Sequence, residues 1–349
     1  MQHTDYKYLD WHTDTWQQVW ATDAGLPHAL LLTGPEGIGK SAFAQALAAR
    51  LLCESPAQDQ ACGVCPSCRW LAGGNHPDFR HVIPAADAEA AAESDDAEKK
   101  KASRQILIDQ IRDLESFVFI GGHRNGARTV IIEPAEAMNA AAENALLKIL
   151  EEPPASVYFI LVSSRFRQLL PTIRSRCRIL KLARPKPDVA KRWMSDQGAA
   201  KAAELLPIMG GAPLLALRES EQGRTSALTS LASSLAEPGR DPLALAARWE
   251  TLLQAKNESG LTMETLVGIV QKWLYDLNEH KQAGRTRYFQ GERAKTIGNL
   301  ANTASVPALI RCYNELLKMR ALASHPLNPR LCLEDMAERY LRALTAERA

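Results

Sequence analysis

The segment GPEGIGKS, residues 34–41, has the glycine and lysine spacing of a phosphate-binding loop. Glycines let the backbone approach a phosphate and turn its N–H groups inward, Lys40 can reach the β- and γ-phosphates, and the Ser41 hydroxyl can bind Mg²⁺. The glycines of this loop are Gly34, Gly37 and Gly39. An apolar run precedes the loop and a helical pattern follows it, which favours a nucleotide site over a chance glycine-rich turn.

A second apolar run, RTVIIE at residues 128–133, is predicted to be the strand that carries the acidic partner of this loop. In hydrolysing ATPases of this type, such a strand ends in an Asp that orients Mg²⁺ and a Glu that activates water. Here Glu133 stands in the place of the metal-side carboxylate and Pro134 in the place of the base. For the chain alone we predict weak or no ATP or ADP binding. We also predict negligible hydrolysis, because proline has no proton acceptor on its side chain. Glu136, or another carboxylate, stays open as a substitute base.

Four of the seven cysteines fall within sixteen residues and form a candidate metal site. They are Cys53, Cys62, Cys65 and Cys68. Overlapping CxxC spacings let thiolates converge on one tetrahedral ion, and four sulfur ligands match a structural Zn²⁺ site without an open catalytic position. We favour zinc over four reduced structural thiols or a redox CxxC motif. We interpret the nearby His76 as a hydrogen-bond partner within its loop.

The elements that must position these residues follow an alternating order. Apolar runs predict four strands, at residues 28–33, 128–133, 157–164 and 176–182, and helical patterns lie between them. This alternation predicts a mostly parallel sheet flanked by helices. Beyond Pro185 the apolar positions recur at helical spacing only, which predicts an all-helical remainder. Residues 85–101, rich in Ala, Glu, Asp and Lys, are expected to be a mobile charged loop or a frayed helix.

Composition excludes several classes. Lys and Arg number 42 against 40 Asp and Glu, a net charge of +2, which argues against a basic nucleic-acid coat or an acidic tail. The longest apolar run, Val157 to Val162, is far too short for a membrane helix, and the N-terminus lacks a signal-peptide pattern. An odd number of cysteines does not suggest a disulfide framework. We therefore expect a cytoplasmic protein.

The segment TIRSRC, residues 172–177, places arginines just before the last predicted strand. A surface arginine can reach a neighbouring molecule and stabilise the charge on a transferring γ-phosphoryl group. The residues alone favour a plainer interpretation, in which such an arginine pairs with a nearby acid.

Several motifs together make the chain resemble the AAA+ clamp-loader family of bacterial DNA polymerase III, and within it the delta-prime branch. They are GPEGIGKS, the four cysteines, NHPDF, AAENALLKILEEPP, VYFILVSS, LLPTIRSRC and NPRLCLED. The resemblance implies an α/β AAA+ domain at residues 1–183, with a zinc module at 53–68 inserted in it. A small helical lid at 184–235 and an all-α collar for oligomerisation at 236–349 are implied to follow.

The same resemblance implies a function. Members of the family form a five-subunit ring with gamma/tau and delta subunits, open a ring-shaped sliding clamp and place it on primed DNA during replication. The chain would then be a component of a DNA-directed DNA polymerase, a nucleotidyltransferase. By the family pattern, Arg176 is implied to act in trans on ATP held by the adjacent subunit, which overrides the plainer interpretation.

Two departures from the motor subunits separate the competing functions. Motor subunits keep Asp-Glu where this chain has Glu133-Pro134, and they carry a lid arginine where this chain has Pro213, after Gly210-Gly211-Ala212. Both prolines favour a ring subunit with little turnover of its own over the alternative, an ATP-hydrolysing gamma/tau-like motor. A small-molecule P-loop kinase would not need the cysteines, and a zinc-ribbon DNA reader would need basic, aromatic residues that are missing around them.

Overall fold

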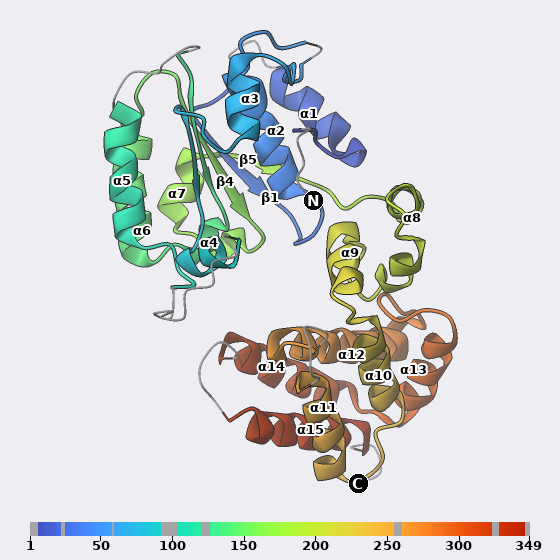
Figure 1. Cartoon of the computed structure of the whole chain (residues 1–349). Coiled ribbons are helices and arrows are strands. Elements are labelled where there is room, and N and C mark those ends of the chain that lie inside the picture. The colour runs from blue at the N-terminus through green and yellow to red at the C-terminus, as the bar shows by residue number, and fades with distance from the viewer. Residues whose placement is uncertain are drawn as a thin grey trace. The chain divides into compact units, whose positions relative to one another are not determined.

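The computed structural model describes residues 6–21, 25–57, 59–91, 103–119, 126–254, 260–322 and 328–345 of the 349-residue chain. The chain divides into two compact units, Met1–Pro185 and Lys186–Ala349 (Figure 1). No helix in the described part of the chain is long and apolar enough to cross a membrane.

The first unit is built on a parallel sheet of five strands in the order β2-β3-β4-β1-β5. The strands are β1 (Ala29–Thr33), β2 (Phe79–Val82), β3 (Arg128–Ile132), β4 (Val157–Ser163) and β5 (Arg178–Lys181). The three inner strands are almost wholly buried, as is typical of parallel sheets covered on both faces. The predicted parallel α/β fold is confirmed, and β2 is a strand that the sequence analysis missed.

Helices cover this sheet on its two faces (Figure 1). They are α1 (Thr13–Trp20), α2 (Lys40–Leu52), α3 (Pro66–Ala72), α4 (Ala85–Ala91), α5 (Ile108–Phe119), α6 (Ala140–Glu151) and α7 (Pro171–Arg176). At the start of α6 the Asn139 side chain accepts a hydrogen bond from the Ala142 N–H and caps the helix. Leu146 and Ile149 of that helix are buried in the same core as Phe159 of β4.

Two sequence expectations for this unit can be compared with the structure. Residues 85–91 form the helix α4, which fits the frayed-helix alternative, while residues 92–101 of the predicted segment lie outside the described residues. The strand predicted at 176–182 begins two residues later, at Arg178, because residues 171–176 form the helix α7. Pro171 is the first residue of this helix, and Ile173 is its buried residue. Arg176 is therefore the last residue of a helix.

The second unit is entirely helical in its described residues. Its helices are α8 (Pro187–Asp196), α9 (Pro213–Glu221), α10 (Thr225–Ala236), α11 (Pro242–Leu253), α12 (Met263–Ala283), α13 (Glu292–Thr303), α14 (Val306–Leu322) and α15 (Pro329–Thr345). Tyr340 joins three of them, since its hydroxyl donates to the Leu235 carbonyl and accepts from the Trp273 indole. One cluster of buried side chains extends from Ala190 to Leu344, so the border between lid and collar at 235/236 stays a prediction.

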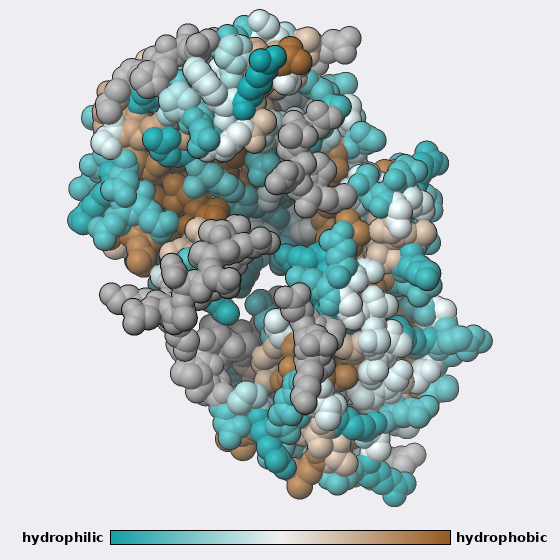
Figure 2. All heavy atoms as spheres, in the orientation of Figure 1, coloured by the Kyte–Doolittle hydropathy of each residue, from teal (hydrophilic) through white to brown (hydrophobic). Residues whose placement is uncertain are grey.

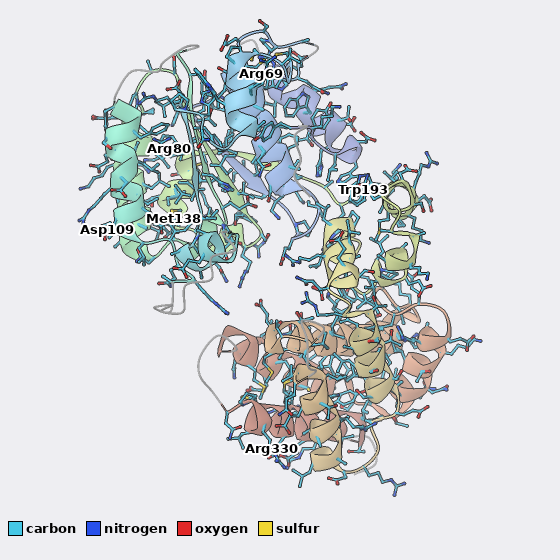
Figure 3. The ribbon with its side chains drawn as sticks, viewed as in Figure 1. Arg69, Arg80, Asp109, Met138, Trp193 and Arg330 are labelled. Atoms are coloured by element: carbon cyan, nitrogen blue, oxygen red, sulfur yellow. The ribbon has the colours of Figure 1, made fainter. Side chains whose placement is uncertain are left out.

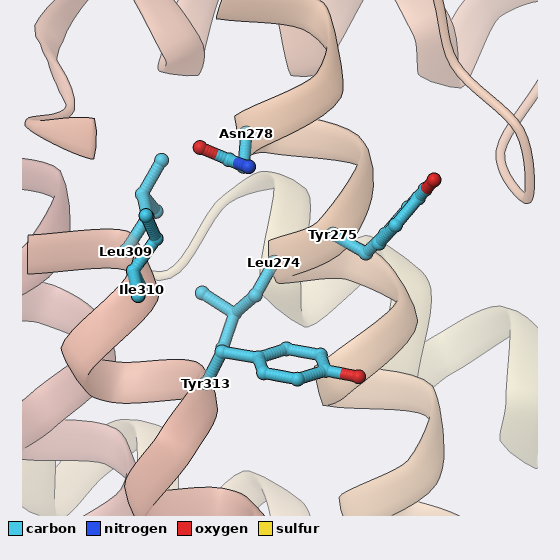
Figure 4. Close-up of a pocket in the computed structure, with 6 residues that line it drawn as sticks. All are labelled: Leu274, Tyr275, Asn278, Leu309, Ile310 and Tyr313. Atoms are coloured by element: carbon cyan, nitrogen blue, oxygen red, sulfur yellow. The ribbon is translucent and has the colours of Figure 1, made fainter. Parts of the chain in front are cut away.

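Hydrophilic residues cover most of the face shown in Figure 2, and apolar residues gather in limited patches between them. In the second unit, a pocket of about 260 Å³ opens between α12 and α14. Leu274, Tyr275 and Asn278 line it from one helix, and Leu309, Ile310 and Tyr313 from the other (Figure 4). This lining carries no acid, base or thiol, so it suits an apolar contact rather than catalysis.

Candidate functional site

The phosphate loop joins β1 to α2 in a backbone conformation that depends on glycine. Gly34, Gly37 and Gly39 have φ angles of 153°, 72° and 97°. A Cβ atom on Gly34 would lie 2.6 Å from the Leu182 carbonyl oxygen and 2.8 Å from Cδ1 of Ile38. These contacts leave no space for a side chain at Gly34, so the loop closely follows the strand next to it.

Lys40 lies buried at the start of α2. Its Nζ donates to the Pro35 carbonyl at 2.7 Å and to the Ser164 hydroxyl at 2.8 Å. Burial lowers the pKa of Lys40, and the carboxylates of Glu133 and Glu136 oppose that change. The ammonium group is thus held over the loop, at the position from which a P-loop lysine reaches phosphate.

Ser41 and Glu133 meet beside this lysine. The Ser41 hydroxyl donates a short hydrogen bond to Oε1 of Glu133, which follows β3 directly. The other oxygen of Glu133 lies 3.7 Å from Nε2 of His81 on β2. A hydroxyl and a carboxylate side by side are the oxygen ligands that Mg²⁺ prefers, so the two residues fit the roles predicted for them.

The position next to Glu133 carries no base, since Pro134 occupies it. Glu136 turns toward the end of β4, where its Oε1 accepts the backbone N–H groups of Ser164 and Arg165 at 3.0 and 3.1 Å. Its Oε2 is buried without a hydrogen-bond partner among the described residues. One oxygen of Glu136 is thus committed to the backbone, and the second keeps the substitute-base alternative open.

The four clustered cysteines lie together at the far end of α2. Their sulfur atoms all fall within 4.8 Å of one another, and the Cys53–Cys65 and Cys62–Cys68 pairs are 4.0 Å apart. Sulfurs bound to one zinc at about 2.3 Å would be spaced by about 3.8 Å, so a small contraction completes a tetrahedral site. No disulfide joins them. The set can therefore hold one metal ion.

Backbone N–H groups point at three of the four cysteine sulfurs. Sγ atoms of Cys53, Cys62 and Cys65 each accept a backbone N–H, at 3.2 to 3.4 Å. The N–H groups of Val64 and Cys65 lower the pKa of Cys62 to about 6. Cys68 lies on α3, next in sequence to the exposed Arg69, which Figure 3 labels. Burial raises the pKa of the Cys68 thiol. His76 is outside the set, and its Nδ1 accepts the Asp78 N–H.

Arg176 lies about a third exposed at the end of α7. Its Nη2 is 2.5 Å from Oε1 of Glu151, the last residue of α6, and its Nη1 donates to the Thr172 carbonyl at 3.1 Å. A guanidinium has five N–H groups, so these two bonds leave three for another partner. Within this chain Arg176 pairs with a nearby acid, and it remains open to solvent.

Two groups at the nucleotide site were not found from the sequence. Ser164 follows β4, next to β3, and His81 lies on the missed strand β2. The carboxyl ends of adjacent parallel strands meet at one edge of the sheet, so Ser164 was open to prediction from its position. His81 had no such signal, because its strand was not recognised.

A parallel sheet with a P-loop at its carboxyl edge and an inserted Cys₄ module fits an α/β domain of the AAA+ clamp-loader class. The family model for the DNA polymerase III delta subunit matches residues 13–186. A Yersinia pestis protein, DNA polymerase III subunit delta′, is 32% identical over 302 residues, which cover 84% of this chain and 82% of that protein. The chain belongs to the family of DNA polymerase III delta′ subunits.

Two further known proteins are similar to this chain. The DNA polymerase III subunit delta′ of Pseudomonas aeruginosa is 42% identical over 218 residues, 60% of this chain. That alignment spans only 61% of the Pseudomonas protein's length. A solved gamma-subunit-related protein from Thermotoga maritima covers 96% of this chain and 100% of its own, at 18% identity and a TM-score of 0.40. The assignment to the family rests on the sequence relatives.

Proposed function

We propose that the chain is the delta-prime subunit of a clamp loader, which joins gamma/tau and delta subunits in a five-membered ring that opens a sliding clamp and places it on primed DNA. The observation that carries this proposal is the relationship to delta′ subunits over most of the chain. The chain would act in the cytoplasm, on DNA, as one subunit of a DNA polymerase holoenzyme. The apolar pocket between α12 and α14 lies in the proposed collar and offers the kind of surface that subunits bury.

Two ligands belong to the proposal. Zn²⁺ would be held by Cys53, Cys62, Cys65 and Cys68 as a structural ion that folds a segment too short for its own core. ATP or ADP with Mg²⁺ would lie on the phosphate loop, with Lys40 on phosphate and with Ser41 and Glu133 on the metal. Without a base at Pro134, hydrolysis by the chain alone should fall by about 10² to 10⁴ from that of a motor subunit.

Arg176 carries the catalytic part of the proposal. The role in trans is supported by its exposure and by three uncommitted N–H groups in a planar fork. A guanidinium presented across an interface meets charge mainly as the γ-phosphoryl group leaves, so its effect appears in the transition state. The second candidate, a gamma/tau-like motor, is supported by the intact loop and by the unpartnered oxygen of Glu136.

The test is a reconstituted clamp loader with partner subunits from the same organism. Arg176→Ala should leave the fold, the zinc content and ring assembly intact, and should slow DNA-stimulated ATP hydrolysis and clamp loading. An arginine in trans contributes about 10³ or more in rate in other P-loop systems, and less here, because only one of several sites faces this subunit. Arg176→Lys should rescue only in part, since lysine lacks the planar fork.

Arg174→Ala is the matched control, because it removes a second arginine from the same helix. Clamp loading at the parental rate by Arg176→Ala would contradict the role in trans, and Arg174 would then be the residue to examine. Robust ATP turnover by the purified chain, abolished by Lys40→Ala, would favour the motor.

A further inference from the structure

The N-terminal segment, residues 6–20, contacts the phosphate loop through two ring N–H groups. The Ile38 carbonyl, inside the loop, lies 3.0 Å from Nε1 of Trp11 and 2.8 Å from Nε2 of His12. A carbonyl only accepts hydrogen bonds, so neutral His12 must carry its proton on Nε2. His12 is 1% exposed, so this contact is shielded from water.

The same segment lies along α2, the helix that begins at Lys40. Phe43 of that helix packs edge-on against the rings of His12 and Trp16, with centroids 5.9 and 5.4 Å apart. Tyr8 stacks on Trp16 at 4.5 Å. These contacts make residues 6–20 a stiff connection rather than a loose tail.

Residues 6–20 also form two hydrogen bonds with the Cys₄ module. The Tyr6 hydroxyl donates to the Leu71 carbonyl at 2.7 Å, and Leu71 lies three residues after Cys68 on α3. The Trp16 indole donates to the Asp59 carbonyl at 3.2 Å, and Asp59 lies between Cys53 and Cys62. Both acceptors are backbone atoms, so their positions depend directly on how the module is folded.

We propose that the metal in the Cys₄ module positions the phosphate loop through residues 6–20. This inference rests on the proposed function, which places a metal in the module and a nucleotide on the loop. With a metal bound, the module fixes the carbonyls of Asp59 and Leu71, and these hold Tyr6 and Trp16. The segment then keeps Trp11 and His12 on the Ile38 carbonyl, so that the loop is ordered before phosphate arrives.

The connection can be cut without touching a metal ligand or the loop. Tyr6→Phe and Trp16→Phe keep an aromatic ring at each position and remove the two donors to the module. The matched control is Tyr8→Phe with Trp20→Phe, the same pair of changes in the same segment. In that control the indole lost has no hydrogen-bond partner among the described residues, and Tyr8 contributes ring stacking.

The experiment uses the full chain loaded with zinc and measures two quantities for each double variant. These are the affinity for a fluorescent ADP and hydrogen exchange at the backbone amides of residues 36–40. Tyr6→Phe/Trp16→Phe should keep its zinc, lose about 5- to 50-fold in ADP affinity, and exchange these amides faster. The control pair should change affinity less than about twofold. Removing zinc from the parent should accelerate the same amides, with little further acceleration in Tyr6→Phe/Trp16→Phe.

The inference is overturned if the two double variants behave alike, or if zinc removal accelerates loop exchange equally in the parent and in Tyr6→Phe/Trp16→Phe. A parent chain that binds no ADP would match the lower end of the predicted affinity, and the exchange measurements alone would then decide the inference. A chain that binds no metal overturns the inference and the proposed zinc site together.

Discussion

The phosphate loop and Arg176 lie in the same unit and are built in opposite ways. Lys40 is buried, and its ammonium group is fixed by the Pro35 carbonyl and the Ser164 hydroxyl. Arg176 is at the surface, and it is held on one side by the acid of a neighbouring helix. The first group is enclosed by its own chain, while the second is oriented by it and left accessible.

Under the proposed function, this contrast separates the residue that would hold a phosphate from the residue that would act on one. The enclosed loop has the groups proposed to bind a nucleotide, but Pro134 stands where the base would be, so we expect little hydrolysis there. The exposed arginine keeps N–H groups free on its solvent side, and we propose that it acts on a phosphate group held by a partner subunit.

The largest expected effect is on the enclosed side. Gly34→Ala should abolish measurable nucleotide binding, because the new Cβ would lie 2.6 Å from the Leu182 carbonyl oxygen and displace the loop. Overpacking of this kind costs about 1–3 kcal/mol in unfolding free energy. Isothermal titration with ADP and chemical denaturation measure the two quantities.

Gly74→Ala is the control for that change. Gly74 also has a positive φ, but nothing lies within 4 Å of its would-be Cβ. It should lose about 1 kcal/mol of stability and no nucleotide affinity. If Gly34→Ala binds ADP as tightly as this control, the loop is not as enclosed as its contacts indicate.

The fold could be predicted from the sequence wherever a strand was an unbroken apolar run. β1, β3 and β4 lie inside the sheet and read as such runs, whereas β2 is an edge strand with exposed Arg80 and His81 and has no such run. Pro171 lies in the first turn of α7, a position that proline favours. The strand predicted at 176–182 did not take this helix signal into account.

The candidate sites were predictable where the residues are neighbours along the chain. The spacing of the loop glycines and of the four cysteines was enough to predict both sites. Ser164 reaches Lys40 across 124 positions, and His12 reaches Ile38 across 26 positions, so tertiary packing alone brings them together. The direction in which Glu136 points was equally undecided, since it depends on the backbone after β4.

A smaller effect is expected on the exposed side, from the acid that holds Arg176. In the reconstituted ring, Glu151→Gln should slow the neighbour's ATP hydrolysis by about 3- to 10-fold, because it frees the guanidinium to sample other rotamers. Glu152→Gln makes the same change of charge at the next residue, which is also exposed, and should have little effect.

The two glutamates are compared in a double-mutant cycle with Arg176→Ala, measured by steady-state hydrolysis at saturating ATP. Glu151→Gln should have no further effect once Arg176 is absent. An equal loss from Glu151→Gln in the presence and absence of Arg176 would mean that the acid acts on something other than the arginine.

The smallest expected effect is a pH dependence of stability on the enclosed side. Burial lowers the pKa of His12 below its ordinary value of 6.5; the hydrogen bond to the Ile38 carbonyl opposes this change in part, and the charge on Lys40 adds to it. The unfolded chain therefore takes up a proton at a pH at which folded His12 is still neutral. The stability that neutral His12 contributes is full above about pH 6.5 and falls as the pH drops toward the folded-state pKa, by at most about 1.4 kcal/mol per pH unit.

His12→Gln keeps an N–H donor for Ile38 but does not titrate, so its unfolding free energy should fall less between pH 7.5 and 5.5. Because burial also lowers the pKa of His76, a part of the slope should remain in that variant. Identical slopes in urea denaturation of the parent and His12→Gln would show that burial and the charge on Lys40 do not hold the pKa of folded His12 below its unfolded value.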